Sequence, residues 1–450
     1  MEDYSSVKLK AHVSTGGGGV ASLDLSGKGL SRVPDAVTEL TEVEELRLDK
    51  NKLTELPTSI NKLKNLIRLH LNDNKLRELP SQIGDLKELR LLDVDKNQLV
   101  SLPTSIQKLN QLEKLHLFGN RLTELPSEIG DLRELRWLGV SNNQLVSLPT
   151  SIQKLNQLEE LHLSGNKLTE TPSEIGDLKK LRRLGVINNE LVSLPTSIQK
   201  LNQLKTLHLS GNKLAELPAE IGDFKELKRL YVDKNQLVCL PASIQKLNQL
   251  EHLYLSGNRL TELPSEIGDL KQLRWLDVSN NQLVSLPTSI LELNQLHGLR
   301  LEDNKLTELP SEISDLRELL RLDVSNNQLV GLPASIQKLN HLEDLDLSSN
   351  KLRELPSEIG DLKELRRLEV RFNQLVSLPT SIRKLNQLEG LHLDGNRLTE
   401  LPSAIGDLKK LRWLHVSGNP LTSDAIQFLG TKIKGLTSTF IKGGCGVSCQ

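Results

Sequence analysis

The chain has 450 residues, and its 57 basic and 58 acidic side chains leave a formal net charge of −1. A balance this close to neutrality excludes bulk electrostatic attraction to nucleic acid or to an anionic membrane as the main function. Aromatic residues make up 2% of the chain and Met occurs once, so we expect an aliphatic core made mostly of Leu.

Several features of the sequence favour the reducing cytosol. The residues after Met1 contain no basic region followed by an apolar run, and no Asn lies in an N-x-S/T glycosylation sequence. Three cysteines occur, Cys239, Cys445 and Cys449. No stretch approaches the ~18 consecutive apolar residues of a membrane-spanning helix. We therefore predict a cytoplasmic protein without a membrane span.

Residues 1–19 fit no repeating pattern and end in four consecutive glycines, Gly16 to Gly19. Such a run is typical of a flexible joint. Neither a G-K-S/T sequence nor a G-x-G-x-x-G turn between a strand and a helix accompanies these glycines, so no nucleotide site is predicted. We expect a flexible N-terminal segment over residues 1–19.

One 23-residue pattern fills residues 20–422, and it reads L-x-x-L-x-L-x-x-N-x-L-x-x-L-P-x-x-I-x-x-L-x-x. The alternation in L-x-L predicts a short strand with Leu on one face. The Asn suits a tight bend in which its side chain bonds backbone groups, so successive Asn residues should form a ladder. The L-P and I-x-x-L spacing predicts one or two helical turns with Pro near their start.

Units of this kind fold together rather than singly. One unit cannot bury its own Leu face, whereas stacked units share a continuous core. At roughly 1.5–3 kcal/mol for each buried apolar side chain, the stacking interfaces are expected to dominate stability. We count eighteen units, the first of which has Lys28 in place of the Asn. The predicted fold is an α/β solenoid with one long parallel sheet.

The repeat pattern breaks near the C-terminal end of the chain. Ser423 is a candidate N-cap, and Ile426, Leu429 and Ile433 recur at helical spacing. We therefore predict a helix over residues 423–434 that covers the open edge of the last repeat, because uncovered sheet edges promote aggregation.

Residues 435–450 are expected to form a flexible tail. Their C-x-x-x-C sequence differs from the C-x-x-C of redox and zinc sites, and a prenylated Cys would have to stand where Val447 is. Free thiols are favoured at Cys445 and Cys449, and acylation is the alternative.

The repeat resembles that of the leucine-rich repeat family, and its L-P-x-x-I-x-x-L form is similar to the Ras-group branch. That branch includes plant intracellular Ras-group proteins, the Ras–phosphatase scaffold of animals, and the repeats of erbin and scribble. The resemblance covers about residues 20–422. It implies a leucine-rich repeat horseshoe with the sheet on the concave face, which usually binds other proteins, and short helical turns on the convex face. The cysteine-rich caps of extracellular leucine-rich receptors are not seen in this sequence.

The third, fifth and seventh positions of each unit are expected to face solvent, and they vary while the framework barely changes. Trp, Tyr and Arg, which dominate the energetic centres of protein interfaces, recur there. The alternative is a solvated face on which Arg321 pairs with Asp323 and Arg367 pairs with Glu369. We predict a protein-binding surface formed by Trp137, Arg183, Arg229, Tyr231, Tyr254, Trp275, Arg300, Arg321, Arg367 and Trp413.

No metal site and no catalytic site are predicted. His116, His162 and His208 occupy the fifth position of alternate units, and strands ~4.8 Å apart place them roughly 10 Å from one another. Zinc–nitrogen bonds of ~2 Å cannot span that distance. Ser210 lies close to His208 in the sequence, but an open repeating surface implies no deep pocket. We therefore expect no cofactor and no enzyme activity.

These observations predict a non-enzymatic intracellular scaffold that binds a protein through the concave face. The Ras-group resemblance alone implies a Ras-like small GTPase or its regulator as the partner. The alternative is a ligand-sensing repeat module of an innate immune or stress receptor whose effector domains lie elsewhere.

Overall fold

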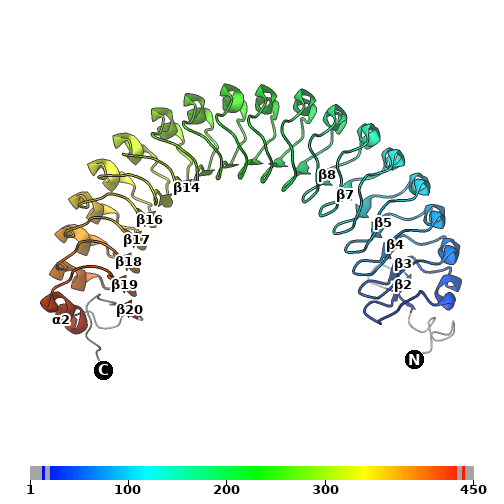
Figure 1. Cartoon of the computed structure of the whole chain (residues 1–450), viewed down its shortest axis with the longest axis horizontal. Helices are drawn as coiled ribbons and strands as arrows, with labels where there is room; N and C mark the ends of the chain where they lie inside the picture. The colour runs from blue at the N-terminus through cyan, green and yellow to red at the C-terminus, as the bar shows by residue number, and fades with distance from the viewer. Residues whose placement is uncertain (1–12, 16–20, 433–437, 441–450) are drawn as a thin grey trace. The chain divides into compact units, whose positions relative to one another are not determined.

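The computed structural model describes residues 13–15, 21–432 and 438–440. These residues belong to two compact units, Met1–Leu227 and Lys228–Gln450. Within each unit, Figure 1 shows short strands along one side of the stacked repeats and helical turns along the other. The predicted α/β solenoid is therefore confirmed in both units. None of the helices in the described residues is long and apolar enough to cross a membrane.

The first unit contains a parallel sheet in which neighbours in the chain are neighbours in space. Equivalent residues of adjacent repeats lie opposite each other, as Leu46 does with Leu69. The central Leu of each strand is buried, which confirms the alternation read from the sequence. The strands are β2 (Ala21–Asp24), β3 (Glu45–Arg47), β4 (Arg68–His70), β5 (Leu91–Asp93), β6 (Lys114–His116), β7 (Trp137–Gly139), β8 (Glu160–His162), β9 (Arg183–Gly185) and β10 (Thr206–His208).

The second unit repeats this arrangement with the same register, so that Leu276 lies opposite Leu299. Its parallel strands are β11 (Arg229–Tyr231), β12 (His252–Tyr254), β13 (Trp275–Asp277), β14 (Gly298–Arg300), β15 (Arg321–Asp323), β16 (Asp344–Asp346), β17 (Arg367–Glu369), β18 (Gly390–His392) and β19 (Trp413–His415).

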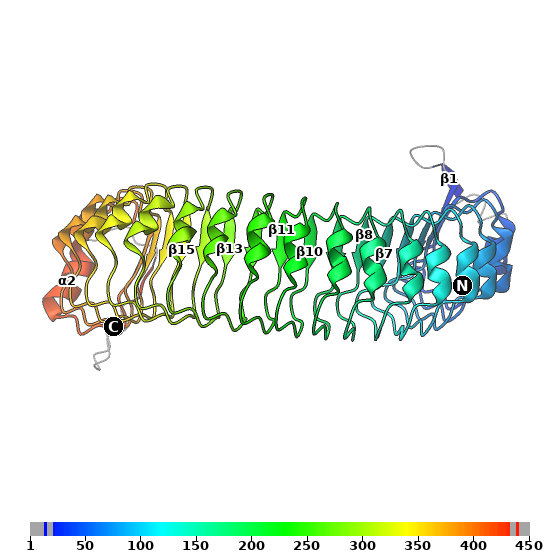
Figure 2. The same ribbon diagram turned by 90° about the horizontal axis from the view of Figure 1, so that it is seen from above.

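The helical turns are five-residue 3-10 helices, and each follows a Pro. Pro264 precedes one of them with φ −67° and ψ 152°, a conformation that the pyrrolidine ring favours. The N–H of Ile267 donates to the carbonyl oxygen of Pro264 at 3.1 Å, which closes the tight turn. Figure 2 shows these helices side by side within each unit. The predicted helical turns with Pro near their start are confirmed.

The helices of the first unit are η1 (Asp35–Glu39), η2 (Thr58–Lys62), η3 (Ser81–Asp85), η4 (Thr104–Lys108), η5 (Ser127–Asp131), η6 (Thr150–Lys154), η7 (Ser173–Asp177), η8 (Thr196–Lys200) and η9 (Ala219–Asp223). Those of the second unit are η10 (Ala242–Lys246), η11 (Ser265–Asp269), η12 (Thr288–Glu292), η13 (Ser311–Asp315), η14 (Ala334–Lys338), η15 (Ser357–Asp361), η16 (Thr380–Lys384) and η17 (Ser403–Asp407).

An Asn after each strand from β3 to β19 ties one repeat to the repeat before it. Asn258 is buried, and its amide nitrogen donates to the carbonyl oxygens of Leu255 at 2.8 Å and Val232 at 3.0 Å. Its side-chain oxygen accepts the N–H of Leu237 at 3.0 Å. Gly257 supplies the left-handed φ of +67° that the bend requires. The predicted Asn ladder is therefore present, and it satisfies backbone groups that burial would otherwise leave unpaired.

Two segments that were expected to be flexible contain strands. β1 (Val13–Thr15) pairs antiparallel with β2, and β20 (Ser438–Phe440) pairs in parallel with β19. These strands lie within the segments 1–19 and 435–450, and each bonds to an edge strand of the parallel sheet. An open sheet edge presents unpaired N–H and C=O groups, and a neighbouring segment that bonds to them is ordered by doing so.

The helix expected over residues 423–434 coincides with α2 (Ser423–Lys432), and residues 433 and 434 lie outside the described part of the chain. The cap is Thr422 rather than Ser423, because the Thr422 Oγ1 accepts the N–H of Ala425 at 3.3 Å. Cys239 is exposed, whereas Cys445 and Cys449 lie outside the described residues.

Candidate functional site: the strand face of the second unit

Two rows of side chains cross the strand face between β13 and β17. Parallel pairing in register places the third positions of these five repeats in one row and their fifth positions in another. We call these ten residues the mixed-charge site. The third-position row is Trp275, Gly298, Arg321, Asp344 and Arg367, and the fifth-position row is Asp277, Arg300, Asp323, Asp346 and Glu369.

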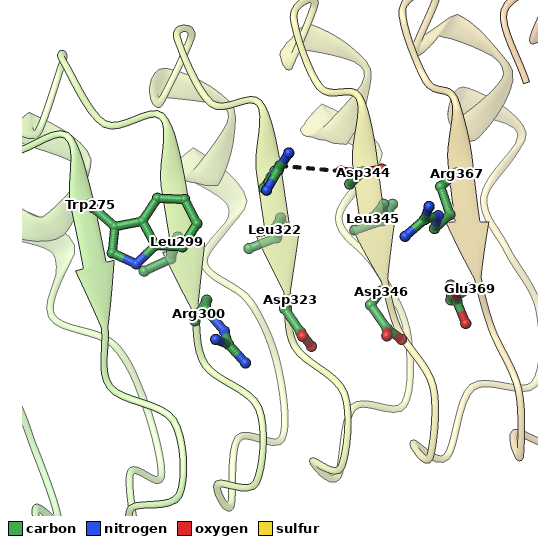
Figure 3. Close-up of a pocket in the computed structure, with 11 residues that line it drawn as sticks. Trp275, Leu299, Arg300, Leu322, Asp323, Asp344, Leu345, Asp346, Arg367 and Glu369 are labelled. Carbon is green, nitrogen blue, oxygen red and sulfur yellow. Dashed lines mark ion pairs between the residues drawn. The ribbon is translucent and has the colours of Figure 1, made fainter. Parts of the chain in front are cut away.

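The two rows border a shallow hollow of about 310 Å³ (Figure 3). Leu299, Leu322 and Leu345 contribute to its lining between the rows, although the solvent-exposed fraction of each is 1% or less. Because side chains alternate along a strand, burying these Leu residues in the core forces both flanking positions outward. The Leu framework therefore positions the polar groups of the site.

Trp275 stands at the β13 end of the hollow (Figure 3). Its ring lies over Gly298 on the next strand. A Cβ atom at Gly298 would collide with the Trp275 ring, so the absence of a side chain there is what lets the indole lie flat. The Nε1 atom of Trp275 is buried and has no hydrogen-bond partner among the described residues. The indole therefore offers an apolar surface at one end of a charged hollow.

Ion pairs in the site run both across neighbouring strands and along single repeats. Arg321 Nε lies 3.2 Å from Asp344 Oδ2 on the next strand. The alternative in which Arg321 pairs with Asp323 is not what the structure shows, since Arg321 pairs with Asp344 of the neighbouring strand, which lies only ~4.8 Å away. The guanidinium of Arg367 forms no ion pair with any residue that the structure describes, and Glu369 pairs instead with Arg371 at 3.2 Å.

The fifth-position row concentrates partly buried carboxylates on adjacent strands. Burial raises the pKa of Asp346, and the neighbouring charge of Asp323 raises it further. Burial also raises the pKa of Glu369, and the neighbouring charge of Asp346 raises it further. The ionised forms of these groups are disfavoured where they stand, so a cationic group placed beside them would be stabilised.

At the β14 end of the row, one guanidinium pairs with two carboxylates of the same chain. Arg300 lies 3.7 Å from Asp277 and forms a short ion pair with Glu302. Burial, followed by the charge of Asp323, raises the pKa of Glu302. Unpaired negative charge therefore gathers toward β15 and β16.

Four of the ten predicted binding residues, Trp275, Arg300, Arg321 and Arg367, line this one hollow. Others lie elsewhere in the second unit. The rings of Tyr231 and Tyr254 stack with centroids 4.6 Å apart, Arg229 shares β11 with Tyr231, and Trp413 on β19 is 39% exposed.

Two of the predicted residues belong to the first unit. Trp137 stacks on His116 with ring centroids 3.9 Å apart, and Arg183 lies 3.7 Å from Glu160.

Reading the sequence one unit at a time missed the role of Asp344, because its partner Arg321 comes from the preceding repeat. A comparison of equivalent positions in adjacent units would have found this pair.

Models of known families match most of the chain. A model described as leucine-rich repeat region matches residues 115–189, 169–256, 242–305 and 335–437. A second, described as leucine rich repeat, matches residues 41–99 and 294–352. The chain therefore belongs to the leucine-rich repeat family. No curated protein matches the sequence.

Solved structures of similar proteins come from bacteria and plants. A leucine-rich repeat protein of Leptospira interrogans is 35% identical over 98% of this chain and 99% of its own, with a TM-score of 0.76. The plant peptide hormone receptor RGFR1, solved in complex with RGF2, is 32% identical over 94% of this chain and 74% of its own, with a TM-score of 0.77. YopM of Yersinia enterocolitica is 29% identical over 89% and 88%, with a TM-score of 0.59.

Proposed function

We propose that the chain is a non-enzymatic protein-binding module and that the mixed-charge site contacts the partner. The observation that carries this proposal is the hollow between the two rows, with an indole at one end and charged side chains of both signs along its sides. Trp and Arg are the side chains that most often dominate interface energetics. Small molecules usually bind in enclosed pockets, whereas an open face of this kind suits contacts with a polypeptide.

The charges define what such a partner should carry. Arg367 lines the hollow, and its guanidinium can bind a carboxylate of the partner through two hydrogen bonds. The carboxylates of Asp323 and Asp346 favour a Lys or Arg side chain of the partner beside them. We therefore propose a partner segment that presents an acidic and a basic side chain close together, with an apolar group for Trp275.

The Ras-group form of the repeat supports a finer proposal. We propose that the chain is a cytoplasmic signalling scaffold and that its partner is a Ras-like small GTPase or a regulator of one. The support is the resemblance of the L-P-x-x-I-x-x-L repeat to that branch, together with the absence of N-x-S/T sequences.

A second candidate function is ligand sensing, in which the strand face takes a peptide. The similarity to RGFR1, a peptide hormone receptor that binds RGF2, favours this candidate. Its effector domains would be carried by another chain or by a longer form of this one.

Selection of binders from a displayed library of linear peptides and small folded domains would test the site. We expect Trp275→Ala and Arg367→Glu each to weaken the selected binders at least about tenfold, because each change removes an interface anchor. The matched controls are Trp413→Ala, at the same repeat position but outside the hollow, and Arg353→Glu, an equal charge change at an exposed position.

Circular dichroism melts of all four variants would show whether the fold is kept. If Trp275→Ala and Arg367→Glu retain full affinity while the melts are unchanged, the mixed-charge site is not the binding surface. If Trp413→Ala alone loses affinity, the surface lies toward β19.

A further inference from the structure

Outside the mixed-charge site, two histidines face each other near the C-terminal end of the second unit. His392 on β18 and His415 on β19 occupy the fifth positions of adjacent repeats and lie opposite each other in the strand pairing. Their Nδ1 atoms are 3.2 Å apart, and the two ring planes meet at 72°. The strand register therefore brings two ring nitrogens to a common point.

Asp394 adds a carboxylate to this pair. Its Oδ1 accepts the N–H of Ser417 at 3.0 Å, while its Oδ2 lies 3.8 Å from the Nδ1 of His415. One ligand atom from each of His392, Asp394 and His415 lies within 4.8 Å of the other two. A backbone hydrogen bond that orients a carboxylate is a usual feature of metal sites.

The separation of the two nitrogens fits a tetrahedral ion. Zinc–nitrogen bonds of ~2.0–2.1 Å at a tetrahedral angle place two ring nitrogens about 3.3 Å apart, close to the spacing found here. Imidazole and carboxylate together suit a borderline transition metal rather than calcium or magnesium. We propose that His392, Asp394 and His415 bind a divalent transition-metal ion such as Zn²⁺, with a fourth position open to water or to a side chain of a partner.

A cationic side chain now stands beside these ligands. Arg371 Nη2 lies 2.5 Å from His392 Nδ1, and Arg371 Nε lies 3.6 Å from Asp394 Oδ2. An ion bound to the same atoms would repel this guanidinium, so Arg371 must swing aside. Its Nε also lies 3.2 Å from Glu369 Oε2, so the side chain keeps a carboxylate partner when it moves. Arg371 is therefore an internal competitor of the metal.

A second grouping in the described residues uses the same three repeat positions in the first unit, namely Asp93, Asp95 and His116. It has a carboxylate where the proposed site has its first His, and Asp95 Oδ1 already accepts the N–H of Phe118 at 2.6 Å. With a single imidazole, this grouping should bind Zn²⁺ more weakly than the proposed site.

The prediction of no metal site compared only the histidines of alternate repeats. The pair His392 and His415 comes from adjacent repeats, so that comparison missed it.

Titration of the full chain with Zn²⁺ against a chromophoric chelator would test the proposal. We expect wild type to hold one ion tightly. Loss of an outer-sphere partner weakens a metal site roughly 10- to 100-fold, so the loss of a ligand in His415→Ala or Asp394→Asn should weaken Zn²⁺ binding by at least that factor. Asp394→Asn keeps an oxygen for the Ser417 N–H. The matched control is His162→Ala, which removes a fifth-position His that bonds Glu160 at 3.1 Å.

Arg371→Ala should tighten Zn²⁺ binding, because the competing guanidinium is removed. Zn²⁺ should also raise the thermal midpoint of wild type more than that of Asp394→Asn, since an ion that binds only the folded chain stabilises it. The proposal is overturned if wild type binds no Zn²⁺, if Asp394→Asn and wild type bind equally, or if His162→Ala is the variant that loses the ion. The Zn²⁺ titration is made without a partner, so its failure and the failure of the mixed-charge site to bind a partner are separate results.

Discussion

At the scale of single residues, the repeat provides its own controls, because each position can be compared with the same position in neighbouring units. Thr171 occupies a place that Leu fills in other repeats, as at Leu125 and Leu148. It is 6% exposed, and its hydroxyl has no hydrogen-bond partner among the described residues. A buried hydroxyl without a partner costs stability, and the missing carbon atoms leave the core underfilled.

Thr171→Leu should therefore raise the free energy of unfolding by about 1–2 kcal/mol. Chemical denaturation would measure the change, and Leu125→Thr at the equivalent position should lower the same quantity. An unchanged or lower stability of Thr171→Leu would show that the local backbone has adapted to the smaller side chain.

A second prediction at this scale concerns pH. Burial, together with the charge of Asp93, raises the pKa of Asp95 from 3.8 to about 6. A carboxyl whose pKa is raised on folding holds its proton more tightly in the folded chain, so its ionisation destabilises the fold as pH rises from about 4 through about 6.

Asp95→Asn removes the charge and keeps an oxygen for the Phe118 N–H. At pH 7 it should raise the free energy of unfolding by up to about 3 kcal/mol, and this advantage should disappear near pH 4. Thermal melts of both proteins at several pH values would measure the difference. A pH-independent difference would contradict the assignment to this carboxyl.

At the scale of elements, the sequence predicted more of the framework than of the chain ends. Alternating Leu, the Asn and the Pro each have one local physical role, so the strand, the bend and the helical turn could be derived from a single repeat. Strands β1 and β20 could not be derived in this way, because they are ordered by pairing with a neighbouring strand and their own residues carry no repeat.

The hydrogen bonds of the Asn ladder should contribute to the stability of neighbouring repeats. Asn304 bonds the carbonyl oxygens of Val278 and Leu301, both at 3.0 Å, and the N–H of Leu283 at 2.9 Å. Asn304→Ala should destabilise the surrounding repeats by roughly 3 kcal/mol or more, because three backbone groups lose their partner in a buried place.

Hydrogen exchange would locate this effect, which should be confined to neighbouring repeats because each repeat contacts only the next. The exposed Asn294→Ala is the matched control and should leave exchange near its wild-type rate. Equal behaviour of the two variants would mean that the ladder contributes little to stability.

At the scale of the whole molecule, the candidate site illustrates where sequence analysis reaches its limit. The outward positions of Trp275, Arg321 and Arg367 follow from the alternation of one repeat. The pairing of Arg321 with Asp344, and of His392 with His415, depends on which residues adjacent repeats bring together. Contacts of that kind require the register between strands, which a single repeat does not contain.

Binding of a partner at the mixed-charge site can be measured directly with the three tryptophans of the chain. Trp137, Trp275 and Trp413 occupy the same repeat position on β7, β13 and β19. Replacing two at a time with Phe leaves one fluorescent reporter in each region. On titration with a selected binder, the protein that retains only Trp275 should show a shifted emission and reduced quenching by acrylamide, and the other two should not change. A response from Trp137 or Trp413 alone would contradict the account.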